Sequence, residues 1–346
     1  MDSRQIREIS MKRMRKLAAG MCLAGLLCTG ANLALASQLV PALGLANDQY
    51  AKAPGPYKVS TNAVLSDCRG LLGVLARIML LDNSLQCNQS FPYGFSNPIS
   101  TSVYYPANIK ELDKLPVVNF VGGILSNQGQ YTDLLRLWAS YGFVVIISSD
   151  FINTAPTMHV LGALELSTLN QDPTSPLFGK VDLSRTIVAG HSAGGGASIL
   201  SSSLPPETLK AIDPQLNYIG SLPIEPGPIG LGSTVRTPTL VLTGAADVVV
   251  PAWAWPRLWQ GGLIRTVPGW SATAHNATHF SPVRSVRENE FAGITTAWIL
   301  YLGKHDPAAK EYFVGKDYKL AKDPQFIRLL LNPLRVQRNE VADDLQ

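Results

Sequence analysis

The sequence of 346 residues has little of what a metal or redox centre requires. It contains four cysteines and five histidines, and it has no Cys-x-x-Cys pair, no predicted helix with His-x-x-x-His spacing and no carboxylate cluster. These absences exclude the common zinc sites and thiol redox motifs. The glycines near Ser192 also lack the spacing and the partner acid of a dinucleotide-binding loop. We therefore expect no metal and no cofactor.

Charged residues are also scarce, at 16% of the chain, and the positive excess comes from the first 36 residues. This segment has six basic and two acidic side chains, so it accounts for the whole formal charge of +4. The remainder is near neutral and gives no basis for a nucleic-acid partner. Low charge together with 46% hydrophobic residues indicates a compact globular domain rather than a disordered chain.

Residues 1–36 have the organisation of a secretory signal peptide. Basic residues between Lys12 and Lys16 precede an apolar run that ends Ala34-Leu35-Ala36 before Ser37. Because this run is long enough to span a bilayer, an uncleaved membrane anchor is the alternative. We expect a secreted or periplasmic protein that has no stable membrane span after the leader is removed.

Only Cys68 and Cys87 remain after the leader. An even pair of cysteines in an oxidising compartment predicts a disulfide, which stabilises the folded chain by about 3 kcal/mol on a loop-entropy estimate. Two buried free thiols are the alternative. Neither cysteine lies near the motifs described below, so we do not expect a thiol nucleophile.

From residue 102 onward, strand-like and helix-like runs alternate. Continuous apolar runs at 116–121 and 143–148 predict central strands that are covered on both faces, and the spacing of 131–141 predicts a helix between them. The alternation predicts an α/β fold whose mostly parallel central sheet has helices on both faces. Other expected elements are an edge strand at 103–106, helices at 68–81, 158–169 and 287–302, and strands at 184–189, 239–242 and 263–267.

The segment Gly190–Gly194 reads Gly-x-Ser-x-Gly and lies between a strand-like and a helix-like run. A serine on so tight a turn has a strained backbone, and the flanking glycines let neighbouring backbone pass close by. The turn lifts the Ser192 hydroxyl out of the sheet, and the helix N-terminus behind it favours negative charge. Ser192 is therefore the candidate nucleophile.

A serine nucleophile needs a base to take its proton and a carboxylate to hold that base. Asp247 follows the strand predicted at 239–242, at the strand end where sites in open sheets gather. Its rivals do not follow so clear a strand and are Glu207, Asp213 and Glu225. Asp247 is the candidate acid.

His279 is the candidate base, because it lies in a loop shortly before the long C-terminal helix, after both the serine and the acid. His275 is the alternative base, and His305 is expected in solvent. His191 is expected to pack beneath the turn, and His159 to lie at the surface or the rim of the site.

An acyl-transfer site also needs two preorganised N–H groups for the oxyanion. One is the N–H of Ala193, the residue after the nucleophile. The other is expected from Ile124, because the preceding Gly122-Gly123 lets the backbone approach closely after the strand at 116–121. The alternative is that the two glycines only form a turn that ends the strand.

The run Leu169–Asp182 followed by Gly190–Gly196 resembles the polyesterase-type bacterial cutinases, which are also similar to lipases of the platelet-activating-factor acetylhydrolase type. The resemblance covers about residues 95–315. Other agreeing segments are Val103–Pro106, Ala139–Val145, Asp247 with Pro251, and Thr278–Pro282. The resemblance implies an α/β-hydrolase fold with nucleophile, acid, base and oxyanion donors at the positions named above.

The sequence departs from this family at positions that affect the substrate. These cutinases usually have an aromatic residue at the place of Ile124 and Met or Gln at the place of Ala193. A cleft tryptophan is replaced by Pro226–Pro228, which weakens a stacking platform for an aromatic polyester. Trp253 and Trp255 are candidates for a substrate-binding aromatic rim, with packing in the core as the alternative. The family's usual C-terminal cysteines are also missing.

These observations divide the chain into a signal peptide at 1–36, an N-terminal extension with the disulfide at 37–94, an α/β-hydrolase domain at 95–315 and a C-terminal tail at 316–346. The function that we expect is hydrolysis of carboxylic esters by a secreted serine esterase through an acyl-enzyme, with an ester or lipid-like substrate. A phospholipid acylhydrolase, an acyltransferase and a non-catalytic binding protein on the same scaffold are the alternatives.

Overall fold

The computed structural model describes residues 44–68, 74, 77, 78, 86–88, 100–150 and 152–345. The predicted signal peptide at 1–36 lies outside these residues. Of the helix predicted at 68–81, four residues are described. Residues 74, 77 and 78 are helical, and Cys68 is not helical.

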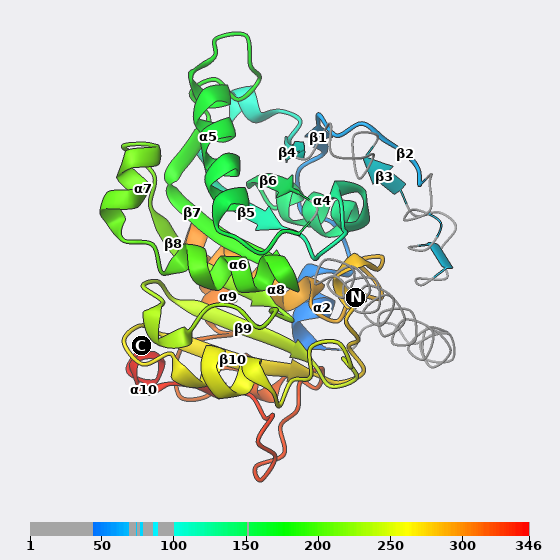
Figure 1. Cartoon of the computed structure of the whole chain (residues 1–346), viewed down its shortest axis with the longest axis vertical. Coiled ribbons are helices and arrows are strands. Elements are labelled where there is room, and N and C mark those ends of the chain that lie inside the picture. The colour runs from blue at the N-terminus through cyan, green and yellow to red at the C-terminus, as the bar shows by residue number, and fades with distance from the viewer. Residues whose placement is uncertain are drawn as a thin grey trace, which may run out of the picture.

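A nine-stranded sheet forms the centre of the molecule (Figure 1). In spatial order its strands are β1 (Val59–Thr61), β4 (Ser100–Pro106), β6 (Val144–Ser149), β5 (Leu115–Val121), β7 (Val181–His191), β8 (Tyr218–Ile224), β9 (Thr239–Gly244), β10 (Gly269–Ala274) and β11 (Gln337–Arg338). The five pairings from β6 to β10 are parallel. The pairs β1–β4, β4–β6 and β10–β11 are antiparallel. The predicted mostly parallel sheet is confirmed.

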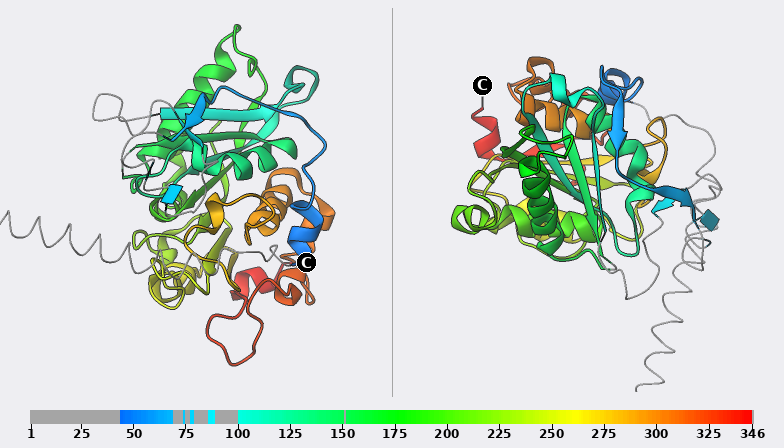
Figure 2. Two further views of the ribbon diagram at one scale, coloured as in Figure 1. Left: turned by 90° about the vertical axis from the view of Figure 1, so that its right-hand side faces the viewer. Right: turned by 90° about the horizontal axis from the view of Figure 1, so that it is seen from above.

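Helices cover both faces of this sheet, as predicted, and give three layers (Figure 2). Apart from the helical residues 74, 77 and 78, the α-helices of the described residues are α2 (Leu45–Tyr50), α4 (Thr132–Ser140), α5 (Thr157–Gln171), α6 (Ala193–Ser202), α7 (Pro206–Ile212), α8 (Ala292–Lys304), α9 (Pro307–Lys310) and α10 (Glu340–Asp343). Helices α5, α6 and α7 lie on one face, and α2, α4, α8 and α9 lie on the other. Among the described residues, no helix has both the length and the apolar character that crossing a bilayer requires.

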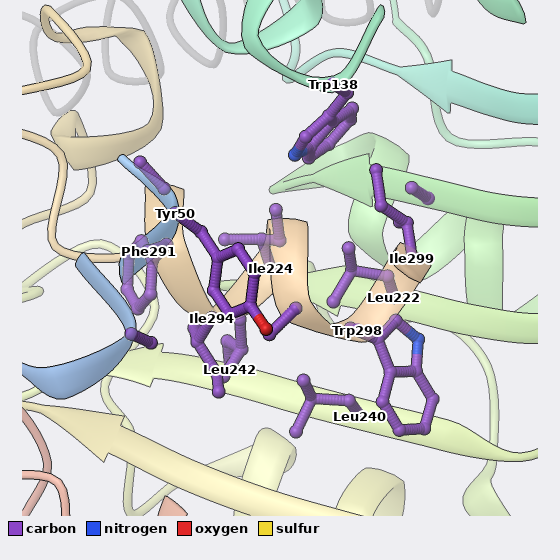
Figure 3. Close-up of a cluster of buried hydrophobic side chains, with 14 of the residues drawn as sticks. Tyr50, Trp138, Leu222, Ile224, Leu240, Leu242, Phe291, Ile294, Trp298 and Ile299 are labelled. Atoms are coloured by element: carbon purple, nitrogen blue, oxygen red, sulfur yellow. The ribbon is translucent and has the colours of Figure 1, made fainter. Parts of the chain in front are cut away.

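The central strands are buried on both faces because alternate residues belong to two different cores. In β6, Val144 and Ile146 lie in the core under α5, whereas Val145 and Ile147 lie in the core under α4 and α8. Figure 3 shows the second core, where Trp298 of α8 lies among residues of β8 and β9. This two-sided burial explains why such strands read as continuous apolar runs.

Two strand predictions need correction. The strand predicted at 263–267 is wrong, because this segment ends a 3-10 helix (Gly261–Leu263) and continues as loop, and the strand is β10. Polar Ser271 and Thr273 interrupt the apolar run of β10 and obscure it in the sequence. The segment 103–106 was predicted as an edge strand but lies inside the sheet. The reason is that β1 (Val59–Thr61), where no strand was predicted, pairs with it.

The helix predicted at 287–302 begins five residues later, at Ala292, and is buried on nearly all sides rather than amphipathic. The reason is that α2 and α9 cover the side of α8 that turns away from the sheet. Asn47 of α2 accepts a hydrogen bond from the Gly293 N–H at 2.7 Å. The predicted C-terminal tail at 316–346 contributes β11 to the sheet, and its apolar residues include buried Phe326 and exposed Leu331.

His159 lies in the core, so the prediction that it lies at the surface or rim is wrong. Its Nε2 donates to the carbonyl oxygen of Ala189 at 2.9 Å, and its Nδ1 accepts from the Ser201 hydroxyl at 2.9 Å. Burial of this ring lowers the pKa of His159 from 6.5 to about 4. The sequence predicted that His159 lies near the start of a helix, which is α5. It did not reveal that α6 packs against the side of α5 that has His159.

The lowered pKa of His159 predicts a loss of stability in acid. Between pH 4 and 6.5 the unfolded chain binds a proton that the folded chain does not, so the free energy of unfolding falls as the pH falls through this range. We expect this group to remove roughly 2 to 3 kcal/mol between pH 7 and pH 4.5. Urea unfolding at both pH values should show a smaller difference for His159→Asn than for wild type. An equal difference in both proteins would contradict the assignment, and His275→Asn, which removes an exposed histidine, is the matched control.

Candidate active site

Ser192 lies at the turn between β7 and α6, with φ of 55° and ψ of −119°. This strained backbone is possible because the residues two positions before and after Ser192, Gly190 and Gly194, have no side chain. A Cβ atom on Gly190 would lie 2.2 Å from the Gly194 carbonyl oxygen, and one on Gly194 would lie 2.0 Å from that of Val121. The glycines of the pentapeptide are therefore required by close backbone contacts, as the spacing predicted.

Backbone hydrogen bonds hold this turn against its neighbours. The Ser192 N–H donates to the Ile224 carbonyl at 3.0 Å, and the Gly227 N–H donates to the Ser192 carbonyl at 2.7 Å. The Gly194 N–H donates to the Gly122 carbonyl at 3.1 Å. The serine is thus fixed between the ends of β5 and β8 at the carboxyl end of the parallel strands, where ligands bind in open α/β sheets.

Three side chains that are distant in the sequence meet above this turn. Nε2 of His279 lies 2.9 Å from the Ser192 hydroxyl oxygen, and its Nδ1 lies 2.8 Å from Oδ2 of Asp247. Asp247 follows β9, and its other oxygen accepts the N–H groups of Val249 and Val250 at 2.8 Å each. Because the Asp247 carboxylate accepts a hydrogen bond from Nδ1–H of His279, the Nε2 atom is left to accept the proton of Ser192.

Ala193, one of the two expected oxyanion donors, follows Ser192 directly, and the residue before the other donor, Ile124, lies against Ser192: a Cβ atom on Gly123 would lie 3.2 Å from Cβ of Ser192. The carbonyl oxygen of Gly123 accepts from the Ser126 hydroxyl at 2.6 Å and from Nδ2 of Asn153 at 2.8 Å. In a trans peptide the C=O and the N–H point in opposite directions. These bonds to the Gly123 carbonyl therefore direct the Ile124 N–H away from Ser126 and Asn153. Among the hydrogen bonds of the described residues, none uses the N–H of Ile124 or Ala193.

Two side chains that support this loop, Asn153 and Tyr131, did not stand out in the sequence. Asn153 is buried at φ of 59° and holds the Gly123 carbonyl. Tyr131 accepts the Gly123 N–H at 2.8 Å, and its oxygen lies 2.8 Å from Nδ1 of His191. His191 therefore packs beneath the turn, where it was expected, and it takes part in the support of the loop.

The rivals of Asp247 have different surroundings. Glu207 is exposed on α7, and Asp213 accepts the Ser167 hydroxyl away from the site. Glu225 is fully buried, and its Oε2 lies 4.0 Å from Nδ1 of His279. The prediction that Glu225 follows no clear strand is wrong, because it comes directly after β8. The alternative base His275 is exposed, and so is His305.

A family model described as PET hydrolase-like matches residues 86–308. The chain belongs to this PET hydrolase-like family. The assignment makes the protein a serine ester hydrolase and agrees with the resemblance to polyesterase-type cutinases.

Similar curated proteins support the assignment. Cutinase 2 of Thermobifida cellulosilytica is 27% identical over 203 residues, which cover 57% of this chain and 71% of that protein. Cutinase cut1 of Thermobifida fusca is also 27% identical over 203 residues, but the match covers 58% of its length. A bis(hydroxyethyl) terephthalate hydrolase of Streptomyces coelicolor is 26% identical over 276 residues, 77% of each chain.

The N-terminal part of this PET hydrolase-like protein includes the predicted disulfide. Cys68 and Cys87 are joined by an S–S bond of 2.06 Å next to the pairing of β2 (Leu65–Asp67) with β3 (Gln86–Asn88). Cys87 lies within the family match, whereas Cys68 precedes it. Nδ2 of Asn127 donates to Sγ of Cys87 at 3.4 Å, so the disulfide contacts the loop that leads to Tyr131.

The two tryptophans after Asp247 have different environments. Trp253 is 67% exposed, whereas Trp255 is half-buried and donates from Nε1 to the Pro226 carbonyl at 2.7 Å. Trp255 therefore lies beside the segment Pro226–Pro228, in which the Gly227 N–H donates to the Ser192 carbonyl. Their role in substrate binding stays a prediction.

Proposed function

We propose that this PET hydrolase-like protein hydrolyses carboxylic esters by acyl transfer to Ser192, with His279 as the base and Asp247 as the acid. The observation that carries the proposal is the continuous contact of these three side chains at 2.9 Å and 2.8 Å, on separate loops at one end of the sheet. The relatives that are cutinases and an ester hydrolase support the same reaction class.

In the first half of the reaction, His279 takes the hydroxyl proton as the Ser192 oxygen attacks the ester carbonyl carbon. The carbonyl oxygen becomes an oxyanion, which the N–H groups of Ile124 and Ala193 stabilise. Asp247 stabilises the imidazolium of His279. When the tetrahedral intermediate collapses, the bond to the alcohol oxygen breaks and His279 gives its proton to the departing alcohol.

In the second half, His279 takes a proton from water as the water oxygen attacks the acyl carbon. The second tetrahedral intermediate breaks the bond to the Ser192 oxygen, which regains its proton from His279. The products are one acid and one alcohol, and the protein returns to its initial state.

An apolar acyl or alcohol group is the substrate feature that fits best. Exposed apolar side chains lie at or close in sequence to residues of the proposed site: Ile124 and Leu125 in the oxyanion loop, and Val248, Val249 and Trp253 within six residues after the acid. Such an exposed apolar rim favours neutral, water-insoluble esters over charged ones. We further propose that residues 1–36 direct the protein to secretion and that the hydrolase domain covers 95–315.

A fluorophosphonate probe and an ester panel test this proposal. We expect one covalent adduct, on Ser192, and a release of p-nitrophenol from p-nitrophenyl esters without an added alcohol acceptor. Chain-length profiling should be run beside phospholipid vesicles and polyester film to define the substrate. An adduct elsewhere, or product formation only with an added alcohol, would contradict hydrolysis at Ser192. Phospholipid as the preferred substrate would favour an acylhydrolase of lipids.

A further inference from the structure

Glu225 is a buried ionisable residue beside the proposed triad that has no role in the reaction above. It follows β8 directly, its side chain is fully buried, and its φ is 45°. A positive φ is unfavourable for a residue with a side chain, and a following proline restricts that residue further. Strain of this kind persists only where the surroundings fix it, and it is concentrated at functional sites.

The carboxyl group of Glu225 approaches two imidazole rings. Its Oε2 lies 3.4 Å from Nε2 of His191 and 4.0 Å from Nδ1 of His279. The second of these atoms is the one that Asp247 holds at 2.8 Å. Within the described part of the chain, neither Glu225 oxygen makes a hydrogen bond of good geometry, although the Asp247 side chain is near enough to interact with this carboxyl group. A buried carboxyl group that is so poorly satisfied is unfavourable, and its presence here requires an explanation.

The charge on Glu225 depends on Asp247. Burial and the adjacent Asp247 carboxylate raise the pKa of Glu225 well above its ordinary value and so favour the neutral form of the side chain. Removal of the Asp247 charge removes one of these causes and favours ionisation. The other ionisable groups around Glu225 are His191, His279, Glu290 and Arg284.

We propose that Glu225 is a positioning residue for His279. When the Asp247 carboxylate is removed, Glu225 acts as a second acid that accepts the hydrogen bond from Nδ1 of His279. Asp247 and Glu225 follow the adjacent parallel strands β9 and β8, so both reach the same ring from the carboxyl end of these strands. The 4.0 Å separation has to shorten to about the 2.8 Å that Asp247 now has. Truncation of Asp247 leaves the space for this movement. The inference rests on the proposed function.

The test compares Asp247→Ala with Asp247→Ala/Glu225→Gln. We expect the single variant to lose about 100-fold in kcat/KM for a p-nitrophenyl ester, and the double variant about 10,000-fold, the usual cost of an absent acid. Because Glu225 has to ionise, the activity of Asp247→Ala should rise with pH, and this rise should be absent from the double variant. Equal rates and equal pH profiles for the two proteins would overturn the proposal.

Glu290 provides the matched control, because it is also a buried carboxyl with a raised pKa but lies beside Arg284 at 3.8 Å. Asp247→Ala/Glu290→Gln should keep the rate of Asp247→Ala, and a loss equal to that of the Glu225 double variant would overturn the proposal. Asp247→Ser repeats the comparison with a hydroxyl that can accept the Val249 N–H, if the alanine variant folds poorly. Absence of a fluorophosphonate adduct on wild-type Ser192 would instead contradict the proposed function.

Discussion

Ser192→Ala should lower kcat for ester hydrolysis by about a millionfold, because loss of the nucleophile costs as much as loss of a whole triad. The fold should be unchanged. The only hydrogen bond of the Ser192 hydroxyl within the described residues is the one to His279, and the backbone bonds of the turn do not involve it. Steady-state kinetics and labelling with a fluorophosphonate measure the loss, and thermal unfolding measures the fold.

A matched control removes a different buried hydroxyl, that of Ser198 in α6, the helix that begins directly after Ser192. Ser198 donates to the Gly195 carbonyl at 2.7 Å and does not contact His279. Ser198→Ala should therefore keep the activity and the label. If Ser192→Ala retained activity within about tenfold of wild type, attack by this serine would be ruled out as the step that limits turnover.

The sequence revealed the site elements that depend on local chain geometry. The Gly-x-Ser-x-Gly spacing predicted a turn between strand and helix, and the structure has Ser192 at this turn with a positive φ. Asp247 could be selected because it follows a recognisable strand, and His279 because it comes after the acid and shortly before the long C-terminal helix. Their contacts with each other and with Ser192 come from the parallel order of β7, β9 and β10, which the alternating pattern predicted.

Other parts of the site could not be read from the sequence, and each omission has a physical reason. Gly220 and Pro223 interrupt the run of β8 in a way that is atypical of a central strand, so Glu225 had no visible strand before it. Asn153 acts through a left-handed backbone and a contact with a loop 30 residues away. The contact of Tyr131 with His191 likewise joins segments 60 residues apart.

Gly194→Ala should have the largest effect on stability of the substitutions considered for this protein. The φ of Gly194 is not positive, so the backbone itself accepts alanine. The added Cβ, however, would lie 2.0 Å from the Val121 carbonyl oxygen and 2.6 Å from that of Gly122. These are backbone atoms of a central strand end that cannot rotate away, so the strand end or the turn has to move.

We expect Gly194→Ala to lower the free energy of unfolding by about 3 kcal/mol or more, the upper range for overpacking of a dense core. The folded fraction should also lose about 100-fold in kcat/KM, because a shift of about 1 Å at Gly122 misplaces the Ile124 N–H, the proposed oxyanion donor. Urea unfolding and ester kinetics on the same preparation measure both quantities.

Gly179→Ala separates steric crowding from backbone conformation. Gly179 has a φ of +66° and no heavy atom within 4 Å of an added Cβ, and it precedes β7 at the end of the strand opposite to Ser192. Its substitution should cost only the left-handed backbone penalty of about 1 to 2 kcal/mol and leave kcat/KM unchanged. If Gly194→Ala were no more harmful than Gly179→Ala in both measurements, the close contact of the turn with β5 would not be what holds Ser192 and the oxyanion loop together.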